Sequence, residues 1–181
     1  MKIVLIGAGK LATNLGRALA ALGHDLQQVY SRTMESASTL ANQLGATPVT
    51  HIEDVDADAD LYIVSVKDSA LGDLIPDLCK GKETKVFVHT AGSMPMDVFK
   101  GMAIHYGVLY PMQTFSKEKK VDFSKIPCFI EASDDYAHEI VSSLAHELSR
   151  MVYELSSEDR KYLHLSAVFA CNFVNHCYAI S

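Results

Sequence analysis

The sequence predicts an α/β protein with a doubly wound, mainly parallel sheet, followed by the start of an all-helical C-terminal domain. Three observations lead to this fold class. Short apolar runs alternate with segments of helical periodicity along residues 1–155. The first run, residues 3–6, is continuously apolar, as expected of a parallel strand that is buried on both faces. Residues 156–181 have a helical period without Gly or Pro. We therefore place a boundary between residues 155 and 156.

Length and composition are those of a globular protein. The chain has 181 residues, of which 49% are hydrophobic and 21% charged, and its net charge is −6. This acidic balance argues against a nucleic-acid partner or a membrane surface. Met1 leads directly into the first strand and leaves no room for a signal peptide, so we expect a cytoplasmic protein. The four cysteines lack C-x-x-C spacing, so we expect buried reduced thiols and predict no metal site.

The first strand ends in a glycine turn that opens a helix. Gly7, Ala8 and Gly9 follow the strand, and Ala12 takes the third small position of a G-x-G-x-x-A pattern. The first glycine allows the tight turn, the second lets a pyrophosphate approach the backbone, and Ala12 lets the helix pack closely on the strand. Because the helix begins with free N–H groups, the turn predicts a dinucleotide site. The alternative is a tight turn that binds nothing.

The second strand, residues 26–30, ends in Ser31, Arg32 and Thr33. A site that prefers NAD places an acidic residue here, on the ribose 2′-hydroxyl. Two hydroxyls and a guanidinium suit a 2′-phosphate instead, so the sequence favours NADP. In the alternative interpretation Thr33 only caps the next helix, and Arg32 is a solvated surface charge.

Helices and strands then continue to alternate. We expect helices over residues 34–44, 70–79 and 137–148, and strands over residues 47–50, 61–66, 86–88, 104–109, 128–131 and 151–155. Pro76 should kink or divide the second of these helices. The strand at residues 61–66 should lie beside the first strand, where the strand order reverses.

Two further strand ends are expected to face the nicotinamide half of the cofactor. Val66 and Lys67 end one of these strands, although Lys67 could instead belong to a turn in which Asp68 or Ser69 caps the next helix. The strand at residues 86–88 leads into four more candidate cofactor contacts, namely His89, Thr90, Ala91 and Gly92. A structural role for His89 remains equally open.

The strand at residues 104–109 leads into the loop Y-P-M-Q-T-F. This loop combines an amide and a hydroxyl with aromatic and apolar groups, which suits the lining of a small-substrate pocket. We therefore predict that Pro111, Gln113 and Thr114 contact substrate. An ordinary rigid proline turn is the alternative.

The last segment is predicted as one helix that starts after Ser156 or Ser157 and runs to residue 181. Its apolar part carries imidazoles and amides, which excludes a membrane span. At 100° per residue, His164, Val168, Cys171 and Asn175 share one face, with Asn172 near its edge. The helix ends without a cap, which indicates packing against a partner or a longer protein.

Five motifs now identify a family resemblance. They are the glycine turn, S-R-T, H-T-A-G-S, Y-P-M-Q-T-F and Y-L-H-L-S-A-V-F-A-C-N-F. With these motifs the whole chain resembles the NADP-dependent oxidoreductases related to pyrroline-5-carboxylate reductase and the coenzyme F420-dependent NADP reductases. It is most similar to bacterial proteins that join a Rossmann domain to a helical domain of unknown function.

The resemblance implies an NADP-binding Rossmann domain over residues 1–155, with residues 156–181 as the first long helix of an incomplete helical domain. The family's pyrophosphate turn falls on Gly7, Gly9, Lys10, Leu11 and Ala12, and its NADP-selecting position on Ser31 and Arg32. Many relatives have a histidine where this chain has Tyr110, so no imidazole role carries over to that position. Related reductases pair through their helical domains, which implies a homodimer.

The functional expectation is hydride transfer between NADPH and a small C=N or C=O substrate. The family's histidine and asparagine on the long helix fall on His164 and Asn172. We assign His164 as the general acid/base and Asn172 as the residue that orients the substrate. A structural His164, hydrogen-bonded in the core or at an interface, is the alternative. At the level of function, the competing hypothesis is an NADP-binding module that senses or scaffolds without turnover.

Overall fold

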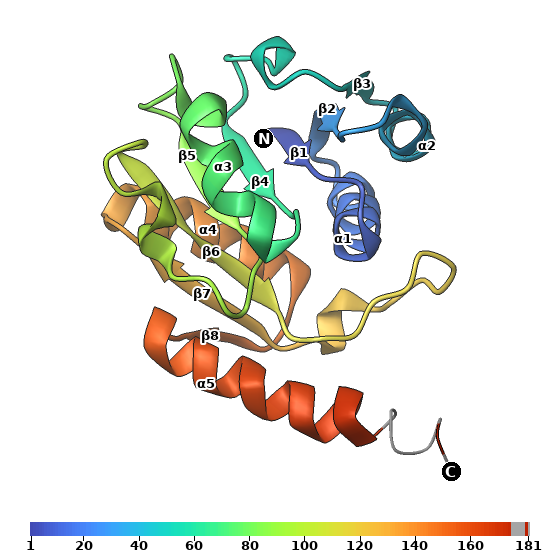
Figure 1. Cartoon of the computed structure of the whole chain (residues 1–181), viewed down its shortest axis with the longest axis vertical. Coiled ribbons are helices and arrows are strands. Elements are labelled where there is room, and N and C mark those ends of the chain that lie inside the picture. Colours follow the sequence, from blue (N-terminus) through green and yellow to red (C-terminus); the bar gives the residue numbers. More distant parts are fainter. Residues whose placement is uncertain (175–179, 181) are drawn as a thin grey trace.

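A computed structural model describes residues 1–174 and residue 180, with the backbone alone for residues 172 and 173. Among these residues, eight strands form one sheet in the order β3-β2-β1-β4-β5-β6-β7-β8 (Figure 1). The strands are β1 (Lys2–Ile6), β2 (Asp25–Tyr30), β3 (Thr47–Val49), β4 (Leu61–Val64), β5 (Val86–His89), β6 (His105–Pro111), β7 (Cys128–Ala132) and β8 (Val152–Glu154). The α-helices are α1 (Lys10–Ala21), α2 (Met34–Leu44), α3 (Asp68–Cys79), α4 (Asp135–Leu148) and α5 (Ser157–Ala167).

The sheet is doubly wound and mainly parallel, as predicted. β1 lies between β2 and β4, so the predicted neighbour of the first strand is confirmed. The strands from β3 to β6 are all parallel. β7 runs antiparallel to β6, and β8 is parallel to β7. The reversal at β7 has a local cause: the segment between β6 and β7 contains only a short 3₁₀ turn, Phe123–Lys125, and not the crossover helix that a parallel neighbour needs.

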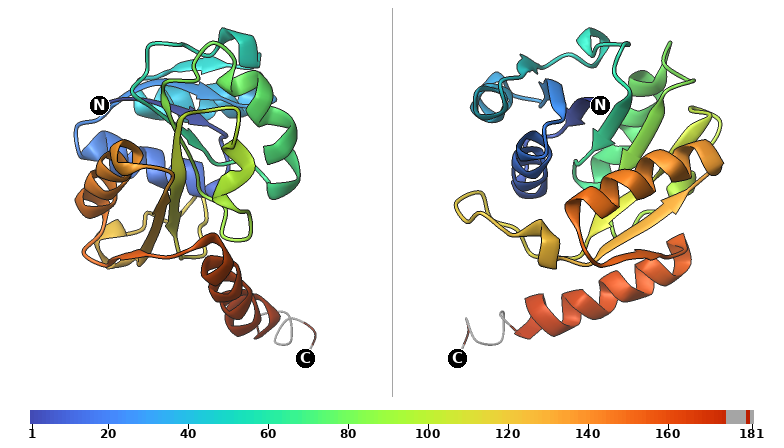
Figure 2. Two further views of the ribbon diagram at one scale, coloured as in Figure 1. Left: turned by 90° about the vertical axis from the view of Figure 1, so that its left-hand side faces the viewer. Right: turned by 180° about the vertical axis from the view of Figure 1, so that it is seen from behind.

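Helices cover both faces of the sheet and form two apolar cores. Side chains alternate along β1, so Ile3 and Leu5 face one layer while Val4 and Ile6 face the other. The first layer comes from α1, α2 and α4, and the second from α3 and the 3₁₀ turn Met96–Phe99. The right-hand view of Figure 2, taken from behind, shows α4 lying over one face of the sheet. The left-hand view shows α5 extending away from the body of the molecule. This arrangement leaves the carboxyl ends of β1, β2 and β4 to β6 available for a site.

Two helices differ from the prediction. α3 runs unbroken through Pro76, so a division of this helix is wrong. Proline has no N–H, so the carbonyl of Gly72, four residues earlier, loses its helical hydrogen bond. Both residues lie on the exposed side of α3, where water can hydrate that carbonyl. The last helix also changes its period, because α5 is followed by the π-helical segment Val168–Phe173. The predicted stripe at 100° per residue therefore does not continue regularly, and Asn175 lies outside the described residues.

The cysteines are only partly as expected. Cys79 and Cys128 are buried free thiols, and burial raises the pKa of Cys79 to about 12 and that of Cys128 to about 11. Cys171 is exposed, so its expected burial is wrong. It follows α5, which extends away from the body of the molecule (Figure 2). Cys177 lies outside the described residues. In the described part of the chain, no helix has the length and apolar character needed to cross a membrane.

Candidate functional site

The turn after β1 requires glycine at its first position and is open at its second. Gly7 has φ +121°, and a Cβ there would overlap the carbonyl oxygen of Ser65 at the end of β4. A Cβ on Gly9 would meet nothing within 4 Å, so this part of the turn is open to a ligand. Gly9 is the N-cap of α1 and provides no side-chain cap, which leaves the first N–H groups of the helix available to an anion.

A hollow of about 420 Å³ lies in front of this turn. It brings together the turn, the end of β2 and the start of α3. Its lining residues are Gly7, Ala8, Gly9, Tyr30, Ser31, Arg32, Ser36, Ser65, Val66, Lys67, Ser69, Ala70 and Leu74. The cofactor contacts predicted at Ser31, Arg32, Val66 and Lys67 therefore surround the same space as the glycine turn. The predicted contacts Lys10, Leu11 and Ala12 form the first turn of α1, directly after the glycine turn, and do not line the hollow.

The end of β2 presents polar groups at the N-terminus of α2. Thr33 Oγ1 accepts a hydrogen bond from the Ser36 amide at 3.4 Å and donates one to Ser36 Oγ at 3.0 Å, so Thr33 caps the helix. Arg32 is exposed and has no hydrogen-bond or ion-pair partner within the described residues. A free guanidinium beside a helix N-terminus and two hydroxyl groups can hold a phosphate. Ser36, which the sequence reasoning missed, adds one of these hydroxyls.

A second hollow of about 360 Å³ lies between the loop after β6 and the last helix. Its lining residues are Tyr110, Met112, Gln113, Thr114, His164, Ala167, Val168 and Cys171. The structure therefore brings the predicted substrate contacts Gln113 and Thr114 together with His164. Pro111 is buried at the end of β6 and does not line the hollow. The side chain of Asn172 lies outside the described residues.

His164 is held against Tyr110. The phenolic oxygen lies 2.8 Å from His164 Nδ1, and the two rings meet edge to face with their centroids 5.7 Å apart. Burial raises the pKa of Tyr110, although the charge of Arg160 opposes this shift, so the phenol stays protonated at neutral pH. The Tyr110 hydroxyl can donate a hydrogen bond to Nδ1 or accept one from it, according to the protonation of the imidazole, and Nε2 has no hydrogen-bond partner within the described residues. Tyr110 thus orients the imidazole, a role that its sequence position alone did not indicate.

His89 has a structural role in this fold. Its side chain is completely buried, Nε2 lies 3.2 Å from the Pro95 carbonyl oxygen, and Nδ1 accepts a hydrogen bond from the Ala91 amide. Burial, assisted by the charge of Arg160, lowers the pKa of His89 to about 4, so the ring is neutral. Thr90 is also buried and bonds to the Val64 carbonyl. The predicted cofactor contact by the His89 side chain is therefore corrected: both ring nitrogens already have partners within the loop.

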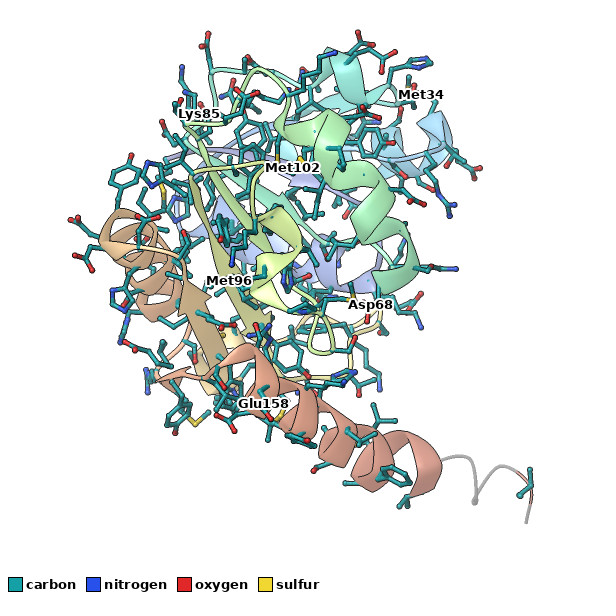
Figure 3. All side chains as sticks on the ribbon, turned by 60° about the vertical axis from the view of Figure 1, so that its left-hand side comes forward. Met34, Asp68, Lys85, Met96, Met102 and Glu158 are labelled. Carbon is teal, nitrogen blue, oxygen red and sulfur yellow. The ribbon has the colours of Figure 1, made fainter. Side chains whose placement is uncertain are left out.

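The start of α5 contains a buried ion pair that the sequence reasoning did not single out. Arg160 is fully buried; its Nη1 donates to Glu131 of β7 at 2.5 Å and its Nη2 to the Met94 carbonyl at 2.7 Å. Ser157 donates to Glu131 through both its amide, at 3.0 Å, and its hydroxyl, at 2.7 Å. Met96 and Glu158, labelled in Figure 3, belong to two of the segments that meet at this junction. An isolated arginine beside Glu158 and Asp159 in the sequence looks like a surface charge.

The predicted helix cap at Asp68 or Ser69 is absent from the start of α3, because Lys67 precedes the helix without a side-chain cap. The Asp68 carboxylate accepts a hydrogen bond from Ser93 Oγ in the loop after β5. Within the described part of the chain, no three His, Cys, Asp or Glu side chains come close enough together to hold a metal ion.

Comparison with protein families matches residues 1–111 to the Rossmann-like domain and residues 126–181 to the domain of unknown function DUF2520. None of the curated proteins matches the chain. Among solved structures, a candidate NADP oxidoreductase from Bacteroides fragilis is 54% identical; the match covers 99% of this chain and 70% of that chain, with a TM-score of 0.95.

Two more distant solved structures share the fold. A pyrroline-5-carboxylate reductase from Coxiella burnetii is 19% identical, with a TM-score of 0.72 and coverage of 88% of this chain and 60% of that chain. An imine reductase from Myxococcus stipitatus, in complex with NADP⁺, is 16% identical, with a TM-score of 0.73 and coverage of 99% of this chain and 63% of that chain.

Proposed function

This chain belongs to the Rossmann-like domain family, and from that premise we propose that it is an NADP-dependent oxidoreductase, which transfers a hydride between NADPH and a small C=N or C=O substrate. One observation carries the proposal. The hollow in front of the glycine turn, at the ends of β1, β2 and β4, and a second hollow at the end of β6 both open at the carboxyl edge of the parallel strands. This edge is where open α/β sheets bind their ligands.

The residues of the first hollow fit NADP. The free N–H groups after Gly9 suit the pyrophosphate, because an anion is stabilised at a helix N-terminus. Arg32, Ser31 and Ser36 suit the 2′-phosphate. Val66 and Lys67 follow β4 and line this hollow, whereas Ala91 and Gly92 follow the neighbouring strand β5 and line neither hollow. An acidic residue that would favour NAD is missing at positions 31–33.

The second hollow suits the reacting end of a substrate. When bound, NADPH supplies the hydride. His164, protonated on both ring nitrogens, donates Nδ1–H to the Tyr110 oxygen and supplies the Nε2 proton to the substrate nitrogen or oxygen, which leaves a neutral imidazole. Gln113 and Thr114 provide an amide and a hydroxyl that orient a polar substrate group. Asn172 belongs to this proposal as a further orienting residue.

Labelled hydride transfer tests the proposal. The protein is incubated with NADPH carrying deuterium at C4 and a panel of small imines and ketones, and the products are analysed for deuterium. A parallel titration measures NADPH binding. We expect transfer to at least one substrate, a large loss of transfer in His164→Gln, and unchanged NADPH affinity in that variant. Tight NADPH binding without transfer to any substrate would overturn the enzyme proposal and favour a binding module.

We also propose that residues 156–181 belong to a C-terminal helical domain through which two copies pair. Tyr162 and Leu165 support this, because they are 61% and 50% exposed on α5, where large apolar side chains gain from burial. Light scattering after size-exclusion chromatography should give the mass of a dimer, and Leu165→Glu should give a monomer. A monomeric wild-type protein would contradict the pairing.

A further inference from the structure

We propose that Arg160 and Glu131 are positioning residues that hold α5 in the register at which His164 meets Tyr110. Their consequence for catalysis rests on the proposed function, whereas their effect on the position of His164 does not. The pair is costly to bury. Arg160 is fully buried and 19% of the Glu131 side chain is exposed, and a buried ion pair is weak evidence for stability alone.

Arg160 and Glu131, together with Ser157, form an anchor that joins one turn of α5 to β7 by several hydrogen bonds. Glu131 accepts from Arg160 Nη1 at 2.5 Å and from the Ser157 hydroxyl and amide at 2.7 and 3.0 Å. These donors lie at positions i and i+3 of the helix, so they determine both its rotation and its position along β7. A salt bridge between two exposed side chains would determine neither the rotation of the helix nor its position along the strand.

The distance from Arg160 to His164 along α5 matches the distance from Glu131 to Tyr110 along the strands. Residues 108 and 131 are paired in the antiparallel ladder, as are residues 110 and 129, so Tyr110 and Glu131 point to the same face of the sheet. Glu131 and Tyr110 are therefore displaced along the strands by two residues, about 6.8 Å. Arg160 and His164 are four residues apart on the helix, about 6 Å. When Arg160 meets Glu131, His164 thus lies beside Tyr110.

Arg160 also binds the segment after β5, which packs against the site. Its Nη2 donates to the Met94 carbonyl, and the Met96 amide donates to Ser157 Oγ, both in the segment after β5. This segment carries Gly92, where an added Cβ would lie 2.5 Å from His164 Nδ1 and 2.8 Å from Tyr110 Cζ. One guanidinium therefore connects the helix, β7 and the loop at the point where they enclose the imidazole. A slip of α5 by one turn, about 5.4 Å, would remove His164 from Tyr110.

The test is a pair of variants read by nuclear magnetic resonance of ¹⁵N-labelled histidine. Arg160→Met/Glu131→Gln removes both charges together, so that no unpaired charge is left buried. Arg160→Lys keeps the charge but cannot reach Glu131 and the Met94 carbonyl at once. Lys161→Met is the matched control, because it removes an exposed cation from the next position of the same helix. His164→Gln assigns the His164 signal, and Tyr110→Phe shows that signal without the phenol.

We expect the His164 signal of the double variant to move to its position in Tyr110→Phe, and that of Arg160→Lys to lie between this and wild type. NADPH affinity should stay unchanged, while the rate of hydride transfer in the double variant falls about 100-fold. Lys161→Met should match wild type in every measurement. A folded double variant with the wild-type His164 signal would overturn the inference. If the double variant does not fold, Arg160→Lys decides: a wild-type signal overturns the inference and an intermediate one supports it. Failure of wild type to transfer hydride would refute the proposed function, while the histidine signals still decide the positioning role.

Discussion

Gly92→Ala is the smallest change that tests the geometry around His164. The added Cβ would lie 2.5 Å from His164 Nδ1, 2.7 Å from its Cγ and 2.8 Å from Tyr110 Cζ. Ordinary contact begins at 3.4 Å, so the imidazole must retreat by about 0.9 Å. Neither neighbour yields easily, since Tyr110 lies within β6 and His164 lies one turn from the buried Arg160. The displacement should therefore break the 2.8 Å hydrogen bond between the Tyr110 hydroxyl and His164 Nδ1.

A misplacement of this size lowers the rate of a positioned reaction by about 100-fold. Single-turnover hydride transfer from labelled NADPH measures that rate, and a fluorescence titration measures NADPH binding. Because Arg32 and the glycine turn lie in the other hollow, the NADPH affinity should fall much less than the transfer rate. Gly72→Ala is the matched control, since a Cβ there meets nothing within 4 Å. A folded Gly92→Ala protein that transfers hydride at the control rate would refute the reasoning.

Three more predictions concern single side chains. Arg32→Ala should weaken NADPH binding by about 10- to 100-fold through loss of charge-assisted hydrogen bonds while leaving NADH binding almost unchanged; equal losses in the two titrations would show that Arg32 does not bind the 2′-phosphate. Tyr110→Phe should slow transfer about tenfold by releasing His164 Nδ1, and an unchanged pH–rate profile and rate would exclude this orienting role. The pKa of His89 is about 4 when folded and 6.5 when unfolded, so the unfolded state binds more protons between these values and stability falls as the pH is lowered. Urea unfolding should show a loss of about 3 kcal/mol across this window that is absent in His89→Gln; the same loss in both proteins would contradict the assignment.

The fold was predictable because its signals are local. The continuous apolar run at β1, the glycine turn and the helical periods determine the order of elements, and the switch point follows from that order. The direction of β7 was less accessible, since it depends on how the segment after Pro111 returns to the sheet. The π-helical segment at Val168–Phe173 also has no periodic signal in a sequence that reads as one helix.

The candidate site was also predictable only in part. Most of the residues that line the first hollow lie at strand ends, so motif and strand order together predicted most of its lining. The contact between Tyr110 and His164 joins residues that are 54 positions apart, and the Arg160–Glu131 pair joins residues 29 positions apart. Such contacts depend on the register of α5 against the sheet, which no local pattern contains. His89 illustrates the opposite case: its place at a strand end was correct, but burial directed its ring into the loop.

The central claim is that NADP binds in the first hollow with its nicotinamide facing the second, and a crystal structure of the protein with NADP⁺ tests it most directly. We expect the 2′-phosphate at Arg32, the pyrophosphate at the glycine turn and the nicotinamide beside Gly92, facing the hollow that His164 lines. A bound NADP⁺ whose nicotinamide lies away from His164 and Tyr110, with the adenosine end at Arg32, would contradict the claim.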